Sequence, residues 1–367
     1  MNIRYIYFFL LICSLTCTYS VFADCADHCP PPSLQDQPPT WESKMRLKMR
    51  QVFDQFLNWS FGEKYKTYAL IHPLEEKKIE RDIPQMRRFS ENYGYYSEHP
   101  IVARVSYREE DLEVICCLLK VLYEQGGSGD YFQIAIAEVL TKVLAYYDLK
   151  IGQRVRIPIE IDGEVNFEPF DVDHIFNIWN GMPAFGLVPE REGVGSLLIF
   201  RGTDFSLDSQ RGRASLLSDL DITGPGFSAF QRSQSEISQW LKTVHGQGKP
   251  ARVMGFSLGG ALAAYTFIYE NHTLSERGSV SMCAPGVKEK VISEWQLLPE
   301  ERRDGFVNYV NMGDITSKVG KLFGDVYALW GAKNYRPLTA HTLLMSSEPF
   351  FFKARVNVKR ENENRSL

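Results

Sequence analysis

Residues 253–260, VMGFSLGG, are the most informative segment of this 367-residue chain. They follow the pattern G-x-S-x-G, in which Gly255 and Gly259 flank Ser257. In this pattern an apolar strand turns so tightly into a helix that the flanking positions can hardly carry side chains, and the serine hydroxyl is lifted clear of the sheet. The strand expected before the turn and the small, helix-forming residues after it supply the required context. The stretch therefore predicts a nucleophile elbow with Ser257 as the catalytic nucleophile.

The helix after the elbow predicts how a reacting carbonyl would be stabilised. Its N-terminus and the backbone N–H of Leu258 are expected to point at the reacting carbonyl, whose oxygen becomes negatively charged. Farther upstream, residues 196–203, SLLIFRGT, read as a second apolar strand that ends in a turn. Together the two segments are typical of the oxyanion strand and elbow of a serine acyl hydrolase.

A nucleophilic serine needs a base, which follows the serine and the acid in the chain order of this topology. Of the seven histidines, His272 and His341 are the two that come after Ser257. His272 lies just past the expected helix, too close in sequence to fold back easily. We therefore expect His341 to be the base.

The acid is expected where a strand ends. Residues 306–311, FVNYVN, read as a strand, and Asp314 lies just beyond its C-terminal end, where catalytic residues of open α/β sheets are found. Asp325 is the alternative, because it also precedes His341, but no strand pattern comes before it. Asp314 is the predicted acid.

These blocks, taken in order, resemble the class 3 lipases, a branch of the α/β-hydrolases. FRGT at 200–203 is similar to the oxyanion motif of that family, and SDL at 218–220 and GPGF at 224–227 resemble its next landmarks. SMCAP at 281–285 and the block at 311–315 resemble the segments after the elbow and around the acid. The resemblance covers residues 171 to 346 and implies an α/β-hydrolase fold with a mostly parallel central sheet.

The resemblance also assigns roles beyond the triad. Thr203 would form the oxyanion hole through its N–H and hydroxyl, together with the N–H of Leu258. The family usually has His where Phe256 stands, and a longer stretch between acid and base. It carries a lid in the region of residues 204–221, and here both a mobile lid and an ordinary surface segment stay open. No metal or organic cofactor is implied.

The rest of the chain divides into segments that differ in composition and in the spacing of apolar residues. Residues 24–40 read as a Pro-rich linker, and 41–150 as a helical accessory domain whose apolar stripes recur at helical spacing. From residue 151 the period changes to alternation up to Asp162-Gly163, a hairpin signal. The catalytic domain is expected at 151–358, followed by a polar tail at 359–367.

The N-terminus predicts export. Arg4 precedes an apolar run that ends with small residues before Ala23, so 1–23 read as a signal peptide and the protein as secreted or periplasmic. In the mature chain Cys25 and Cys29 are expected to form a local disulfide, and an incomplete zinc site with His28 is the alternative. Cys116 and Cys117 lie in an apolar helical pattern and are expected in the core.

A net charge of −4 with both signs interspersed argues against nucleic acid as a partner. The sequence thus predicts an exported serine lipase or esterase acting on acyl esters or lipids, with transient contact to a lipid interface. Two alternatives stay open. One is a non-catalytic binding or effector module on a hydrolase fold, and the other is a lipid acyltransferase with the same triad. The choice among triglyceride, phospholipid and small soluble ester also stays open.

Overall fold

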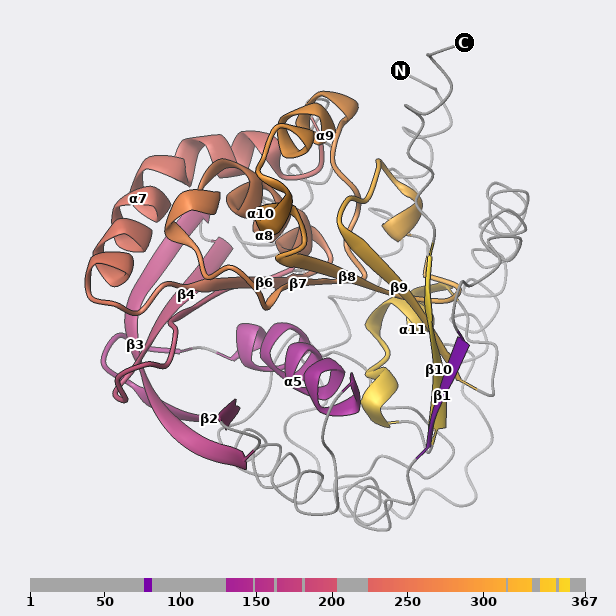
Figure 1. Ribbon diagram of the computed structural model, residues 1–367, viewed down its shortest axis with the longest axis horizontal. Helices are drawn as coiled ribbons and strands as arrows, with labels where there is room; N and C mark the ends of the chain where they lie inside the picture. Colours follow the sequence, from indigo (N-terminus) through magenta and orange to yellow (C-terminus); the bar gives the residue numbers. More distant parts are fainter. Residues whose placement is uncertain are drawn as a thin grey trace, which may run out of the picture.

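The computed structural model of this chain describes residues 76–80, 130–147, 149–161, 164–179, 182–202, 224–314, 316–331, 337–347 and 350–356. This part of the chain builds a ten-stranded sheet with helices on both faces (Figure 1). The strand order is β1-β10-β9-β8-β7-β6-β5-β4-β3-β2. The strands are β1 (Glu76–Glu80), β2 (Arg154–Ile161), β3 (Glu164–Trp179), β4 (Met182–Pro189), β5 (Leu197–Phe200), β6 (Arg252–Phe256), β7 (Ser279–Met282), β8 (Phe306–Asn311), β9 (Asp325–Gly331) and β10 (Phe350–Arg355).

The centre of the sheet is parallel and its edges are antiparallel. Strands β5 to β9 pair in parallel with one another, whereas β2, β3 and β4 form an antiparallel meander that also joins β5 antiparallel on one side, and β10 and β1 continue the sheet antiparallel from β9 on the other. The expectation of a mostly parallel sheet therefore holds for the centre alone. Short connections such as the one between Ile161 and Glu164, which pair with each other, can only join antiparallel strands. The hairpin signal at residues 162–163 correctly predicted this pair.

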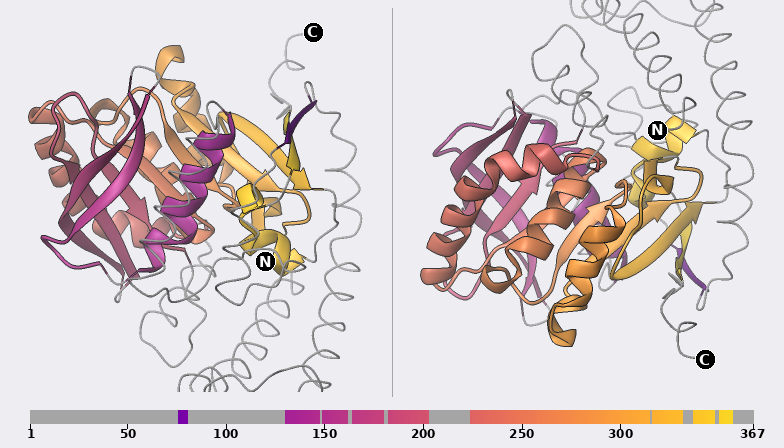
Figure 2. Two further views of the ribbon diagram at one scale, coloured as in Figure 1. Left: turned by 90° about the horizontal axis from the view of Figure 1, so that it is seen from below. Right: turned by 90° about the horizontal axis from the view of Figure 1, so that it is seen from above.

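Helices cover both faces of the sheet. On one face lie α7 (Phe227–Gly246), α8 (Leu258–Tyr269), α9 (Glu289–Gln296) and α10 (Glu300–Arg303), and on the other lie α5 (Asp130–Lys142) and α11 (Pro337–Thr342) (Figures 1 and 2). The central strands separate two hydrophobic cores, because successive side chains of a strand point to opposite faces. In β6, Met254 and Phe256 join the core on the α5 side, and Val253 joins the core on the α7 and α8 side.

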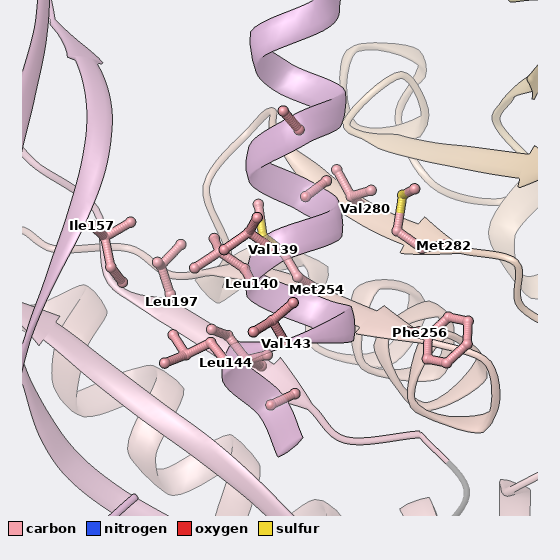
Figure 3. Packing of buried hydrophobic residues seen from close by; sticks show 14 of the residues in the cluster. Val139, Leu140, Val143, Leu144, Ile157, Leu197, Met254, Phe256, Val280 and Met282 are labelled. Carbon is pink, nitrogen blue, oxygen red and sulfur yellow. The ribbon is translucent and has the colours of Figure 1, made fainter. Parts of the chain in front are cut away.

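Helix α5 belongs to the core of the sheet. Its buried residues Val139 and Leu140, together with Val143 just after the helix, lie beside Leu197 of β5 and Met254 of β6 (Figure 3). Of the range 41–150, predicted to be a helical accessory domain, the structure describes residues 76–80, 130–147 and 149–150; buried residues between Ile134 and Leu149 share one core with the strands, and β1 pairs with β10. The reason is that the apolar stripe of α5 covers the face of the central strands that α7 and α8 leave open. Helix α5 and the strands after residue 150 therefore share one core.

Several sequence predictions lie outside the described residues: the signal peptide, the Pro-rich linker, the four cysteines of residues 25–117, the lid of residues 204–221 and the polar tail. Within the described residues, none of the helices has both the length and the apolar character needed to cross a bilayer.

Candidate active site

The elbow forms where the sequence predicted it. Strand β6 ends at Phe256, α8 begins at Leu258, and Ser257 between them has φ 54° and ψ −128°. A positive φ is uncommon for a residue other than glycine and costs backbone energy. The turn is held by backbone hydrogen bonds, from Ser257 N–H to Met282 O at 3.0 Å and from Gly260 N–H to Ser257 O at 2.9 Å.

The two flanking glycines explain why the chain can turn so tightly. A Cβ placed on Gly255 would lie 2.1 Å from the carbonyl oxygen of Gly259, across the turn. A Cβ placed on Gly259 would lie 2.4 Å from the carbonyl oxygen of Phe200, at the end of β5. Both contacts are with backbone atoms, which cannot rotate away. Glycine at these positions therefore lets β6, α8 and the end of β5 meet at the serine.

Three side chains from separate elements meet at the elbow. His341, in α11, has its Nε2 3.0 Å from Ser257 Oγ and its Nδ1 2.9 Å from Asp314 Oδ1. A carboxylate can only accept, so Nδ1–H donates to Asp314 and Nε2 is left to accept the serine proton. All three side chains are buried. This is the geometry that a serine nucleophile, its base and an orienting acid require.

Asp314 is held firmly in this row. It follows the C-terminal end of β8, as expected, and its Oδ1 also accepts a hydrogen bond from the backbone N–H of Thr316 at 2.9 Å. The residue is 1% exposed, so water does not screen its charge from the imidazole. The acid therefore presents one oxygen in a fixed place to the histidine.

The two alternatives weighed in the sequence lie elsewhere. His272 lies in the turn Asn271–Thr273 after the far end of α8 and is exposed. Asp325 is the first residue of β9 and forms an ion pair with Arg355 of β10. Neither side chain reaches Ser257 or His341 by any hydrogen bond among the described residues.

Of the two residues expected to form the oxyanion hole, Leu258 lies among the described residues. Leu258 is the first residue of α8, so its N–H is one of the helix N–H groups without an intrahelical partner. Thr203, the other expected donor, lies outside the described residues. Phe256 packs its ring on His341, with 4.7 Å between the ring centroids and 32° between the ring planes. Class 3 lipases, which the sequence resembles, usually have His at this position. An apolar ring therefore forms the wall behind the base.

Cys283, which no sequence motif marks as a site residue, lies beside the acid and the base. Its Sγ, an oxygen of Asp314 and a nitrogen of His341 all lie within 4.8 Å of one another, the one arrangement among the described residues with spacing suited to a metal ion. Burial raises the pKa of the Cys283 thiol to about 12. A protonated thiol is a poor metal ligand, and the Nδ1–H of His341 already donates a hydrogen bond to Asp314. These donors do not fit a resident metal.

Asn311 was also missed as a functional candidate, although it closes the strand that leads to the acid. Its Nδ2 donates to Ala340 O at 2.9 Å and to Leu343 O at 3.0 Å, on both sides of His341. An asparagine at the end of a strand pattern could have suggested a polar role there, but not which carbonyls it would reach.

Comparisons with known proteins assign this chain to no family. No protein-family model and no curated protein matches the chain. Among solved structures, it is similar to a triacylglycerol lipase from Penicillium expansum, with a TM-score of 0.37 and 14% sequence identity over 54% of this chain and 78% of that chain. The roles of the residues therefore rest on the geometry of the site itself.

Proposed function

We propose that this protein is a serine hydrolase of α/β-hydrolase type that cleaves carboxylic esters through an acyl-enzyme. The observation that carries the proposal is the buried row of hydrogen bonds from Ser257 through His341 to Asp314. Such a row on a strained turn costs backbone energy and buries charge, so a role in folding alone does not account for it.

The reaction follows from the positions of the atoms. His341 Nε2 takes the proton from Ser257 Oγ as that oxygen forms a bond to the ester carbonyl carbon. The carbonyl oxygen becomes an anion that the N–H of Leu258 can stabilise, and the resemblance to class 3 lipases adds Thr203 as a second donor. His341 then gives its proton to the leaving alcohol as the ester bond breaks. Water repeats the sequence on the acyl-enzyme, releases the acid and returns the proton to Ser257.

Throughout this cycle Asp314 remains ionised. It stabilises the imidazolium that forms when His341 carries two protons, and it keeps the ring from rotating. We extend the proposal to an exported lipase or esterase, on the basis of the N-terminal pattern of residues 1–23 and the resemblance to class 3 lipases. The acyl length and the headgroup of the substrate are left to experiment.

The first experiment compares the mature protein with Ser257→Ala on p-nitrophenyl esters from acetyl to palmitoyl, with and without a lipid interface. We expect the variant to lose at least about 10³-fold in kcat/KM. The matched control is Ser293→Ala, because the Ser293 hydroxyl is exposed and bonds the Glu289 carbonyl of its own helix. The chain-length profile then separates an esterase from a lipase.

A fluorophosphonate probe, which needs an activated serine but no acyl acceptor, distinguishes the remaining outcomes. Labelling of Ser257 without ester hydrolysis would point to an acyltransferase that lacks its acceptor alcohol. Absence of both labelling and hydrolysis would contradict the proposal and favour a binding module on this fold.

A further inference from the structure

Helix α5 brings a buried ion pair next to the active site. Lys142 Nζ lies 2.9 Å from Glu138 Oε1, one helical turn away, and both side chains have 0% exposure. The pair lies outside the stretch that resembles class 3 lipases, which begins near residue 171. The ester-hydrolase mechanism above does not use it.

Both members of the pair bind the chain that follows the catalytic histidine. Glu138 accepts hydrogen bonds from the backbone N–H groups of Met345 and Ser346, each at 2.8 Å, and from Ser346 Oγ at 2.7 Å. Lys142 Nζ donates to the carbonyl oxygen of Leu343 at 2.6 Å. These contacts fix residues 343–346, which follow His341 directly along the chain.

A third side chain, that of Asn311, also binds the backbone around His341. As described above, Asn311 donates to the carbonyls of residues 340 and 343. The carbonyl oxygen of Leu343 thus accepts hydrogen bonds from the Lys142 ammonium of α5 and from the Asn311 amide of β8. The backbone on each side of His341 is held by groups from two other elements, so a small shift of α5 or β8 would move the imidazole relative to Ser257.

The environment favours the charged form of Lys142. Burial acts to lower the pKa of Lys142, but the attraction and hydrogen bond of Glu138, joined by the charge of Asp314, outweigh it, so the pKa of Lys142 is raised above its ordinary value. Lys142 Nζ also lies 5.5 Å from the centre of the Phe256 ring, which packs on His341. The ammonium therefore lies near the triad, paired with Glu138 and close to the ring that packs on the base.

Stability alone does not explain such a pair. The cost of removing two charges from water commonly equals or exceeds their attraction, and well-packed apolar residues of the same size are often as stable or more so. The pair instead fixes the position and orientation of the backbone that it binds, because each hydrogen bond holds only at a short distance and over a narrow range of angles.

We propose that Glu138 and Lys142 are positioning residues that hold His341 in line with Ser257, so that helix α5 is a working part of the active site. The inference rests on the proposed function, because it assigns how the catalytic base is held. It also assigns a task to a segment N-terminal to the lipase-like stretch.

The test uses the full mature chain and three variants: Lys142→Met, Glu138→Gln and the double variant. The matched control is Lys249→Met, since Lys249 Nζ also donates to a backbone carbonyl, that of Pro189 at 2.6 Å, away from the triad. Displacing a catalytic group by about 1 Å can cost about 10²-fold in rate. We expect kcat to fall about 10- to 100-fold in all three variants with KM within about twofold, and neither value to change in the control.

The double variant separates positioning from folding. Single variants leave one buried charge unpaired and are expected to melt at a lower temperature, whereas the double variant removes both charges and should recover most of that loss. Its kcat should stay low, because the carbonyl of Leu343 keeps only the amide of Asn311, and the glutamine offers one acceptor oxygen to the three donors that the two oxygens of Glu138 bind. A double variant that is stable and regains the kcat of the wild type would overturn the inference. If the single variants do not fold, Ser346→Ala removes one of the bonds to Glu138 and should lower kcat about twofold to fivefold.

A spectroscopic measurement keeps this inference separate from the proposed function. The proton that His341 Nδ1 donates to Asp314 should give a strongly deshielded NMR signal that is lost in His341→Gln, whether or not a substrate is known. We expect it to broaden or shift in the α5 variants and to stay unchanged in Lys249→Met. If the wild type hydrolyses no ester, the proposed function fails while this signal still tests the positioning. An unchanged signal in the folded double variant would refute the positioning role.

Discussion

Replacing the acid of the row, Asp314→Asn, tests the site most sharply. Asp314 Oδ1 accepts from His341 Nδ1 at 2.9 Å and from the N–H of Thr316 at 2.9 Å. If the amide oxygen of the asparagine takes both bonds, the geometry survives and the charge is lost. If the amide NH₂ faces the ring instead, the imidazole must carry its proton on Nε2 and can no longer accept from Ser257.

Either outcome has a calculable cost. A unit charge about 4 Å from the imidazolium in surroundings of effective dielectric about 20 contributes about 4 kcal/mol, and each 1.36 kcal/mol is about tenfold in rate. Loss of the charge alone therefore lowers kcat about 10³-fold. The wrong tautomer brings the loss toward about 10⁴-fold. Thermal stability should change little, because the buried site loses a charge while the shape is kept.

The assay measures kcat on the best p-nitrophenyl ester together with the melting temperature, for Asp314→Asn and for the control Asp325→Asn. Asp325 is on the surface of β9 with Arg355, and exposed pairs of this kind contribute at most about 1 kcal/mol. The control should keep the activity of the wild type. A folded Asp314→Asn protein with kcat within about tenfold of the wild type would refute the reasoning, and so would an equal loss in Asp325→Asn.

Three further predictions test the surroundings of the site. Gly259→Ala should destabilise the fold by about 3 kcal/mol in urea unfolding, because its Cβ would lie 2.4 Å from Phe200 O, whereas Gly246→Ala, with open space around it, should not destabilise the protein. Cys283, whose pKa burial raises to about 12, should resist iodoacetamide at pH 8 in the native protein and react after unfolding in urea, as read by peptide mass mapping. Lys142 has a pKa above its ordinary 10.5, so its contribution to stability is complete below that pH and is lost as the pH rises through the folded value. The melting temperature of the wild-type protein should therefore fall more steeply above pH 10.5 than that of Lys142→Met. Parallel curves of melting temperature against pH for the two proteins would contradict this prediction.

The elbow could be predicted because its causes are local. The glycines at 255 and 259 matter through atoms a few residues away or at the end of the neighbouring strand, and the apolar run before them already indicates a buried strand. The position of Asp314 followed from the same logic, since a strand pattern ends just before it. The rejection of His272 rested on its closeness to α8 in the sequence, and the structure places it apart from the triad.

The role of α5 could not be predicted from its pattern. Glu138 and Lys142 stand four residues apart, a spacing that on most helices indicates an exposed ion pair. The apolar stripe of the helix shows that one face is buried but does not say against what. In the structure the same two side chains are wholly buried and bind residues 343–346, some 201 positions along the chain from Lys142 to Leu343.

By itself, the sequence determined the strand, turn and helix around Ser257, the hairpin before the central strands and the order of the three candidate catalytic residues. These depend on steric limits and side-chain periods that act over a few residues. Only the tertiary structure decided that His341 meets Ser257 and Asp314, that the sheet is antiparallel at both edges, and that α5 lies beneath the site. Such contacts join residues distant along the chain, and the free energy that selects them comes from burying whole faces of elements against one another.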